Sequence, residues 1–175
     1  MNTFFLDGTL DRPYPLQYAI SLYHEVIKYK PKVCYELGSS WGFTTCAIAK
    51  ALSDINEGGK LYSYEILPER VEQCRRSLKR FGLDSICQVE TKDIFLDHIY
   101  LLFQCDFLYI DIHNNGQRVQ AIIDKIVDTK LVYFEGGSIV RNEVCKERNV
   151  PTFENLDYDV IFGHNLRHSF SKIKK

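Results

Sequence analysis

Short apolar runs alternate along the chain with longer segments in which apolar residues recur every three or four positions. The short runs have the length and composition of strands, and the longer segments have the spacing of helices with one apolar face. This alternation predicts an α/β fold with a mostly parallel sheet. Strands are predicted over residues 33–37, 61–66, 85–91, 105–111, 131–135, 158–162 and 167–173, and helices over residues 14–29, 43–52, 68–81, 96–104 (a short helix and turn), 117–127 and 139–150.

The predicted strands also indicate how the centre and one end of the sheet are arranged. Residues 105–111 are almost continuously apolar, which is typical of a central parallel strand covered on both faces. The last two predicted strands are separated by Gly163-His164-Asn165-Leu166, which predicts a tight turn. We therefore expect an antiparallel hairpin to complete a seven-stranded sheet.

Composition and charge narrow the kinds of protein that this chain can be. Its 175 residues are 45% apolar and 26% charged, which is ordinary for one globular domain, and residues 1–13 look irregular. The net charge of −1 argues against a general binder of nucleic acid or anionic membranes. No run reaches the roughly 20 apolar residues of a membrane helix, and the first residues lack a signal-peptide pattern. We expect a single cytoplasmic domain (1–175), monomeric or homodimeric, that binds neither nucleic acid nor membranes.

The six cysteines are never spaced as Cys-x-x-Cys, and most fall on apolar faces of predicted elements. We therefore expect reduced thiols in the core and neither disulfides nor zinc ligands. They are Cys34, Cys46, Cys74, Cys87, Cys105 and Cys145.

The most informative stretch runs from Val33 to Leu52, where a predicted strand, a loop with two glycines and a helix follow one another. At the end of a parallel sheet, such a unit holds a small molecule against loop backbone and a helix N-terminus. The loop is Gly-x-x-x-Gly and lacks the Gly-Lys-Ser/Thr ending of a phosphate-binding loop. Glu36, near the strand's end, suits a ligand with a cationic amino group or free hydroxyls. This pattern argues against a nucleoside triphosphate.

The sequence Glu36-Leu37-Gly38, followed after three residues by Gly42-Phe43-Thr44, resembles motif I of class I S-adenosylmethionine-dependent methyltransferases. It is most similar to the small O-methyltransferases of the catechol and caffeoyl-CoA type and their bacterial relatives. The resemblance covers about residues 14–173. It implies a Rossmann-like sheet of seven strands, mostly parallel with an antiparallel last strand, helices on both faces, and S-adenosyl-L-methionine as cofactor.

The resemblance also implies which residues bind this cofactor. Glu65 closes the second predicted strand, where one carboxylate can accept hydrogen bonds from both ribose hydroxyls; the alternative is an ordinary strand-end acid. Asp93 and Ile94 follow the third strand, where the family contacts the adenine; the alternative for Asp93 is a helix N-cap. The predicted cofactor-binding residues are Glu36, Gly38, Ser39, Ser40, Gly42, Phe43, Thr44, Glu65, Ile66, Asp93, Ile94 and Asp111.

Asp111 ends the fourth predicted strand, and the sequence that follows it resembles motif IV of the same family. The resemblance places an aspartate at this point next to the transferring methyl group. The predicted catalytic residues are therefore Asp111 and His113, with His113 as the base because imidazole titrates near neutrality. The alternative for His113 is a side chain that only borders the pocket or bonds to backbone.

The end of the fifth predicted strand departs from the resembled family. The catechol and caffeoyl-CoA type enzymes hold a divalent cation with an aspartate after strand four and an Asp-Asn pair after strand five. Asp111 matches the first position, but Glu135-Gly136 stands at the second, and the lysine beyond strand four is missing. Two oxygen ligands can hold Mg²⁺ only weakly. No metal site is therefore assigned, and Mg²⁺ is left as a disfavoured option.

These observations predict a methyltransferase that uses S-adenosyl-L-methionine and acts on a small-molecule acceptor, most simply at oxygen. The alternative is a catalytically inactive protein of the same fold that serves as a cofactor-binding or interaction domain. A nicotinamide dehydrogenase is disfavoured by the loop spacing. No Asn/Asp-Pro-Pro-Tyr/Phe sequence, which base-methylating relatives usually carry, follows strand four.

Overall fold

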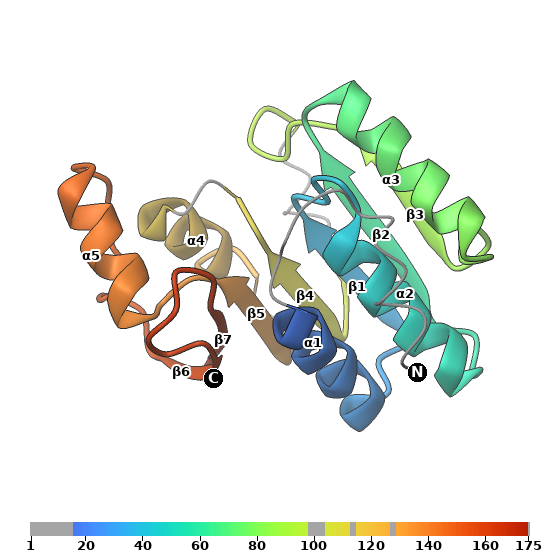
Figure 1. Cartoon of the computed structure of the whole chain (residues 1–175), viewed down its shortest axis with the longest axis horizontal. Coiled ribbons are helices and arrows are strands. Elements are labelled where there is room, and N and C mark those ends of the chain that lie inside the picture. The colour runs from blue at the N-terminus through green and yellow to red at the C-terminus, as the bar shows by residue number, and fades with distance from the viewer. Residues whose placement is uncertain (1–15, 98–103, 113–114, 127–128, 175) are drawn as a thin grey trace.

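A computed structural model describes residues 16–97, 104–112, 115–126 and 129–174. In these residues seven strands form one sheet with the order β3-β2-β1-β4-β5-β7-β6 (Figure 1). Pairs among β1 to β5 are parallel, and β7 runs antiparallel to both of its neighbours, β5 and β6. The predicted fold class is confirmed. The strands are β1 (Val33–Leu37), β2 (Lys60–Glu65), β3 (Cys87–Thr91), β4 (Phe107–Ile110), β5 (Leu131–Glu135), β6 (Tyr158–Phe162) and β7 (Phe170–Ile173).

Local sequence explains where several helices begin and end. Pro68 opens α3, where its missing N–H has no helical partner in any case. The Ser138 hydroxyl accepts a hydrogen bond from the Arg141 N–H and caps α5, and Asn115 caps α4 in the same way. The described helices are α1 (Leu16–Tyr29), α2 (Phe43–Ile55), α3 (Pro68–Arg80), α4 (Gly116–Ile123) and α5 (Ile139–Glu147).

Side chains alternate between the two faces of the sheet, and each face has its own core. Phe107 and Tyr109 of β4 pack in the cluster that includes residues of α1, α2 and α3. Leu108 and Ile110 pack in the cluster that includes residues of α4 and α5. Figure 1 shows α1, α2 and α3 in front of the strands. Because both faces of β4 are covered, its sequence is continuously apolar.

The structure refines several predicted boundaries. β7 begins at Phe170, so the hairpin connection is longer than the predicted four-residue turn, although the Leu166 N–H does bond to the Gly163 carbonyl at 2.8 Å. Most of the helix predicted over 96–104 lies outside the described residues. All six cysteines are buried and free, which confirms their prediction. Burial raises the pKa of the Cys74 thiol to about 12, which makes it a poor nucleophile.

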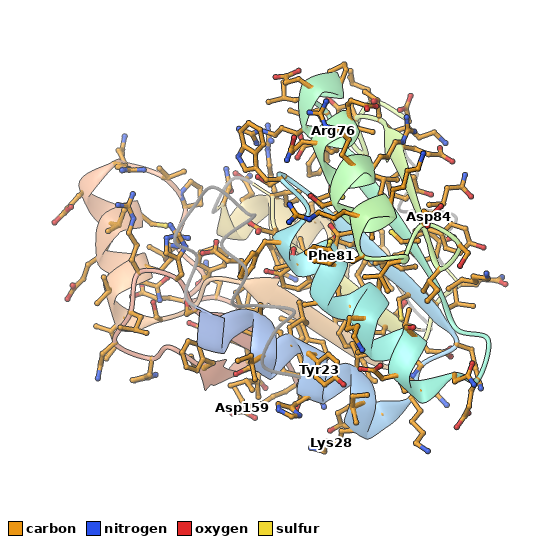
Figure 2. All side chains as sticks on the ribbon, turned by 45° about the vertical axis from the view of Figure 1, so that its right-hand side comes forward. Tyr23, Lys28, Arg76, Phe81, Asp84 and Asp159 are labelled. Atoms are coloured by element: carbon orange, nitrogen blue, oxygen red, sulfur yellow. The ribbon has the colours of Figure 1, made fainter. Side chains whose placement is uncertain are left out.

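The helices on the front face are joined to each other and present polar groups outward. Tyr23 of α1 donates a hydrogen bond of 2.7 Å to Asp54 at the end of α2, and Arg76 stands on the outer side of α3 (Figure 2). Among the described residues, no helix combines the length and apolar character needed to cross a membrane.

Candidate functional site

The loop between β1 and α2 is pressed against the end of β4. The Asp111 N–H donates to the Leu37 carbonyl at 2.8 Å, and the Gly38 N–H donates to the Tyr64 carbonyl at 2.8 Å. Gly38 has a φ of +94°, and a Cβ on it would lie 2.1 Å from the Asp111 carbonyl oxygen. Only glycine satisfies both conditions, so Gly38 brings the β1, β2 and β4 ends together.

Glu36 lies beneath this loop and does not line the cavity described below. It has no exposed surface, and its carboxylate accepts hydrogen bonds from Thr44 (2.6 Å), Thr45 (2.5 Å) and Ser63 (2.6 Å). Burial raises the pKa of Glu36, and the three hydroxyl donors oppose that shift. Glu36 therefore ties β1 to the start of α2 and to β2. Its predicted contact with a ligand's amino group stays a prediction.

Glu65 ends β2 and connects the loop to the following turn. Its Oε2 accepts a hydrogen bond from the Ser40 N–H at 2.9 Å, and its Oε1 accepts from Ile66 (2.8 Å) and Leu67 (3.1 Å). Arg70 Nη1 lies 4.0 Å from Oε2. A carboxylate has about four lone-pair sites, so this one still has capacity for a further donor. Ser40, with a φ of +47°, holds the strained loop conformation that reaches it.

A cavity of about 270 Å³ opens over the carboxyl ends of these strands. It contains seven predicted site residues in one place: Gly38, Ser40, Glu65, Ile66, Asp93, Ile94 and Asp111. The other predicted loop residues, among them Thr44 and the buried Ser39, do not line it. The remaining lining residues are Tyr64, Leu67, Arg70, Lys92, Phe95, Ile112 and Arg118.

Asp93 caps a turn, as in the alternative predicted for it, and its contact with the adenine stays a prediction. Its Oδ1 accepts hydrogen bonds from the Phe95 N–H (2.9 Å) and the Leu96 N–H (3.3 Å), which caps the turn after β3. It also lines the cavity, as do the buried Ile94 and Ile66, which is 46% exposed. Apolar side chains together with a carboxylate suit a flat heterocycle that carries an amino group.

Sequence reasoning missed the cationic side chains of the cavity. Arg70 of α3 lies beside Glu65, with its guanidinium 5.9 Å from the centre of the Trp41 ring. The Arg118 guanidinium lies 5.0 Å from the centre of the Phe95 ring. The only sequence signal was position: each follows a strand-end acid by a few residues, in the first turns of the next helix.

A second group of charges lies at the same edge of the sheet, at the ends of β4 and β5. Ile110 pairs with Phe134, so the next residues, Asp111 and Glu135, are neighbours across the two strands. Burial raises the pKa of Asp111 well above its ordinary range, and the Glu135 carboxylate raises it further. His113, the predicted base, lies outside the described residues.

The Glu135 carboxylate has two partners from other parts of the chain. Arg141 of α5 donates from Nη2 to Glu135 Oε1, and His168 Nδ1 lies 3.2 Å from the same oxygen. Among the described residues no group of three or more His, Cys, Asp or Glu side chains is placed to hold a metal ion. Because Glu135 is already paired with Arg141, the residues present do not fit the divalent cation of the resembled enzymes.

No protein-family model and no curated protein sequence matches the chain. Among solved structures, it is similar to an O-methyltransferase from Bacillus cereus in complex with SAH, with a TM-score of 0.70, 17% identity, and coverage of 93% of this chain and 83% of that one.

Two further solved structures are similar in the same way. The O-methyltransferase TomG from Streptomyces achromogenes in complex with SAM has a TM-score of 0.70 and 13% identity, with coverage of 94% and 84% of the two chains. An RNA methyltransferase from Salinibacter ruber in complex with S-adenosyl-L-homocysteine has a TM-score of 0.63 and 14% identity, with coverage of 93% and 92%. The chain therefore has the fold of these methyltransferases over nearly its whole length.

Proposed function

We propose that the protein is a methyltransferase that uses S-adenosyl-L-methionine. One observation carries the proposal: the cavity at the carboxyl ends of β1 to β4 gathers the glycine loop, Glu65, the Asp93-Ile94 pair and Asp111 in one place. Each of these features comes from a different strand end, so they converge only in the folded chain. The similar solved structures include enzymes bound to SAM or SAH, which supports the same ligand class for this chain.

The residues that line the cavity suggest which part of the cofactor each of them binds. Glu65 faces the cavity with a carboxylate that suits the ribose hydroxyls. Asp93, Ile94 and Ile66, which all line the cavity, suit the adenine. The Gly38 to Thr44 loop suits the methionine portion, and Glu36 contributes by fixing that loop from below. The buried hydroxyl network keeps the loop in one conformation before the ligand arrives, which reduces the ordering cost of binding.

When bound, S-adenosyl-L-methionine supplies a methyl group on a sulfonium, which an acceptor oxygen takes by in-line displacement. A bond from methyl carbon to oxygen forms, the carbon–sulfur bond breaks, and the acceptor's proton goes to a base. The chain's part is to orient the acceptor and take that proton. Asp111 lies at the cavity. His113 stays the sequence-based candidate for the base, and His168, held near Glu135, is a second one.

A small-molecule acceptor is the class we favour. The net charge of −1 gives no general attraction to nucleic acid, although the fold also occurs in an RNA methyltransferase. The expected cytoplasmic location and the monomeric or homodimeric state stay predictions. The alternative, cofactor binding without transfer, draws support from the end of β5, where an Arg141 ion pair stands in place of the expected cation ligands.

Calorimetric titration with S-adenosyl-L-methionine and S-adenosylhomocysteine tests the proposal directly. We expect binding of one molecule per chain with a dissociation constant in the micromolar range, about −8 kcal/mol. Absence of binding at about 1 mM ligand would remove the methyltransferase function. Binding without turnover of any acceptor in a screen would favour the inactive alternative.

A further inference from the structure

The ends of β4 and β5 place two acidic residues side by side, with Glu135 buried and Asp111 partly exposed at the cavity. Asp111 directly follows the paired residue Ile110, and Glu135 directly follows its partner Phe134. Glu135 is 5% exposed. A carboxylate buried in this way needs a positive charge close by, because its charge is poorly screened inside the protein. The relatives resembled by the sequence meet this need with a divalent cation.

Here the positive charge belongs to the chain itself. Arg141 is 3% exposed and donates from Nη2 to Glu135 Oε1. Its backbone N–H donates a hydrogen bond of 3.1 Å to the Ser138 hydroxyl, so the first turn of α5 fixes the backbone position from which the side chain extends. The guanidinium also acts on Asp111, where its charge opposes the rise in pKa caused by burial. The buried arginine is therefore paired with Glu135, and its charge also favours the ionised form of the neighbouring Asp111.

The surrounding loop holds this arrangement in place. The Ser138 hydroxyl donates to the Leu166 carbonyl at 2.7 Å, and the Ser138 N–H donates to Ser169 Oγ at 3.2 Å. The Gly136 N–H donates to the Ser169 carbonyl at 2.9 Å. These bonds join the start of α5 to the segment before β7, which carries His168 to the same Glu135 oxygen. The end of β5 is therefore closed by protein groups on both sides.

We propose that Arg141 is a built-in replacement for the divalent cation: it neutralises Asp111 and Glu135, excludes a metal from this edge, and makes the site independent of metal. A second observation indicates that charge attraction, more than a complete set of hydrogen bonds, holds the Arg141 guanidinium at this place. Arg141 Nε is buried and has no hydrogen-bond partner among the described residues. A divalent ion at the same place would meet the guanidinium charge at close range.

The metal alone tests this proposal, whatever the acceptor is. Mn²⁺ is titrated into the wild-type protein and the free ion is followed by electron paramagnetic resonance. We expect no bound Mn²⁺ up to about 1 mM, the weak limit of protein sites for such ions. Binding of one Mn²⁺ per chain at micromolar concentration that is lost in Asp111→Asn would overturn the proposal.

Charge variants provide the matched comparison. In Arg141→Met the cation is removed while the side chain's bulk is largely kept, and we expect Mn²⁺ affinity to rise at least about tenfold. Arg141→Lys keeps the charge and should bind no Mn²⁺. Equal Mn²⁺ affinity in the Met and Lys variants would contradict the proposal.

Arg141→Met removes the buried guanidinium from Glu135 and is expected to unfold at lower denaturant concentration than wild type. Adding Glu135→Gln should restore much of that loss, because the arginine and the glutamate compensate one another. A double variant no more stable than Arg141→Met would refute the pairing. If Arg141→Met is too unstable to purify, we expect the double variant to be recovered folded, and a double variant that also fails to fold would contradict the pairing. Titration with S-adenosylhomocysteine on the same samples tests the proposed function separately, since neither result depends on the other.

Discussion

Glu65→Gln gives the sharpest test of the cofactor site. The substitution keeps the size of the side chain and removes its negative charge at the end of β2. In the folded protein this carboxylate accepts three backbone hydrogen bonds, from Ser40, Ile66 and Leu67. A glutamine has one carbonyl oxygen, which accepts, and one NH₂ group, which only donates. The NH₂ group would therefore face a backbone N–H that also donates. We therefore expect both weaker cofactor binding and a less stable loop.

The expected size of each effect follows from these contacts. A hydrogen bond to a charged group contributes about 1.5–3 kcal/mol. Losing one such bond to a ribose hydroxyl should weaken binding of S-adenosylhomocysteine by about 10- to 100-fold, since about 1.4 kcal/mol is a factor of ten. The mismatched N–H donor should lower the free energy of unfolding by about 1–3 kcal/mol.

Calorimetry at a temperature well below each unfolding midpoint separates the two effects, and denaturant unfolding measures the second. Glu69→Gln is the matched control, because Glu69 is an exposed acid on the first turn of α3, close to Glu65. It removes the same charge without touching the loop and should bind like wild type. Unchanged affinity in Glu65→Gln, or an equal loss in Glu69→Gln, would show that the ribose assignment is wrong.

Three further predictions concern the loop, the buried acids and the base. Gly38→Ala should lower the free energy of unfolding by about 2–4 kcal/mol and abolish cofactor binding, because its Cβ meets the Asp111 carbonyl. Gly82 also has a positive φ, but a Cβ there would have no atom within 4 Å. In denaturant unfolding, Gly82→Ala should therefore lose less stability than Gly38→Ala. The pKa of Asp111 is raised in the folded state. Its contribution to the free energy of unfolding is therefore fully present below the unfolded pKa near 4 and is lost as the pH rises. Between about pH 4 and 8 the free energy of unfolding should fall less steeply in Asp111→Asn than in the wild type. His168→Gln should slow methyl transfer to whichever acceptor a screen identifies while leaving the calorimetric affinity for S-adenosylhomocysteine unchanged; weaker cofactor binding would refute its role at the acceptor.

Much of the fold was determined by the sequence itself. The bounds of β1, β5 and β6 are the predicted ones, because each is a short run of strand formers between turn residues. The glycine loop was recognisable for a similar reason: Gly38 has a backbone conformation that other residues rarely adopt. Glu65, Asp93 and Asp111 could be placed at the site because carboxyl ends of parallel strands share one edge of the sheet.

Tertiary structure decided what each of these groups does. The Glu36 carboxylate is engaged by Thr44, Thr45 and Ser63, so it supports the loop from beneath, and the sequence could not show that Ser63 comes from the neighbouring strand to meet it. Arg70 lines the cavity with its guanidinium 4.0 Å from Glu65, a placement that helical spacing alone does not indicate.

The partner of Glu135 was equally beyond prediction. Arg141 lies six residues further along the chain in an unremarkable helix, and His168 lies in the last hairpin. A sequence shows how residues are spaced along the chain. Ion pairs across a sheet edge also depend on the order of the strands and on which charged side chains become buried away from water. For this protein, periodicity determined the sheet, and packing at the ends of β4 and β5 determined the charge balance of the site.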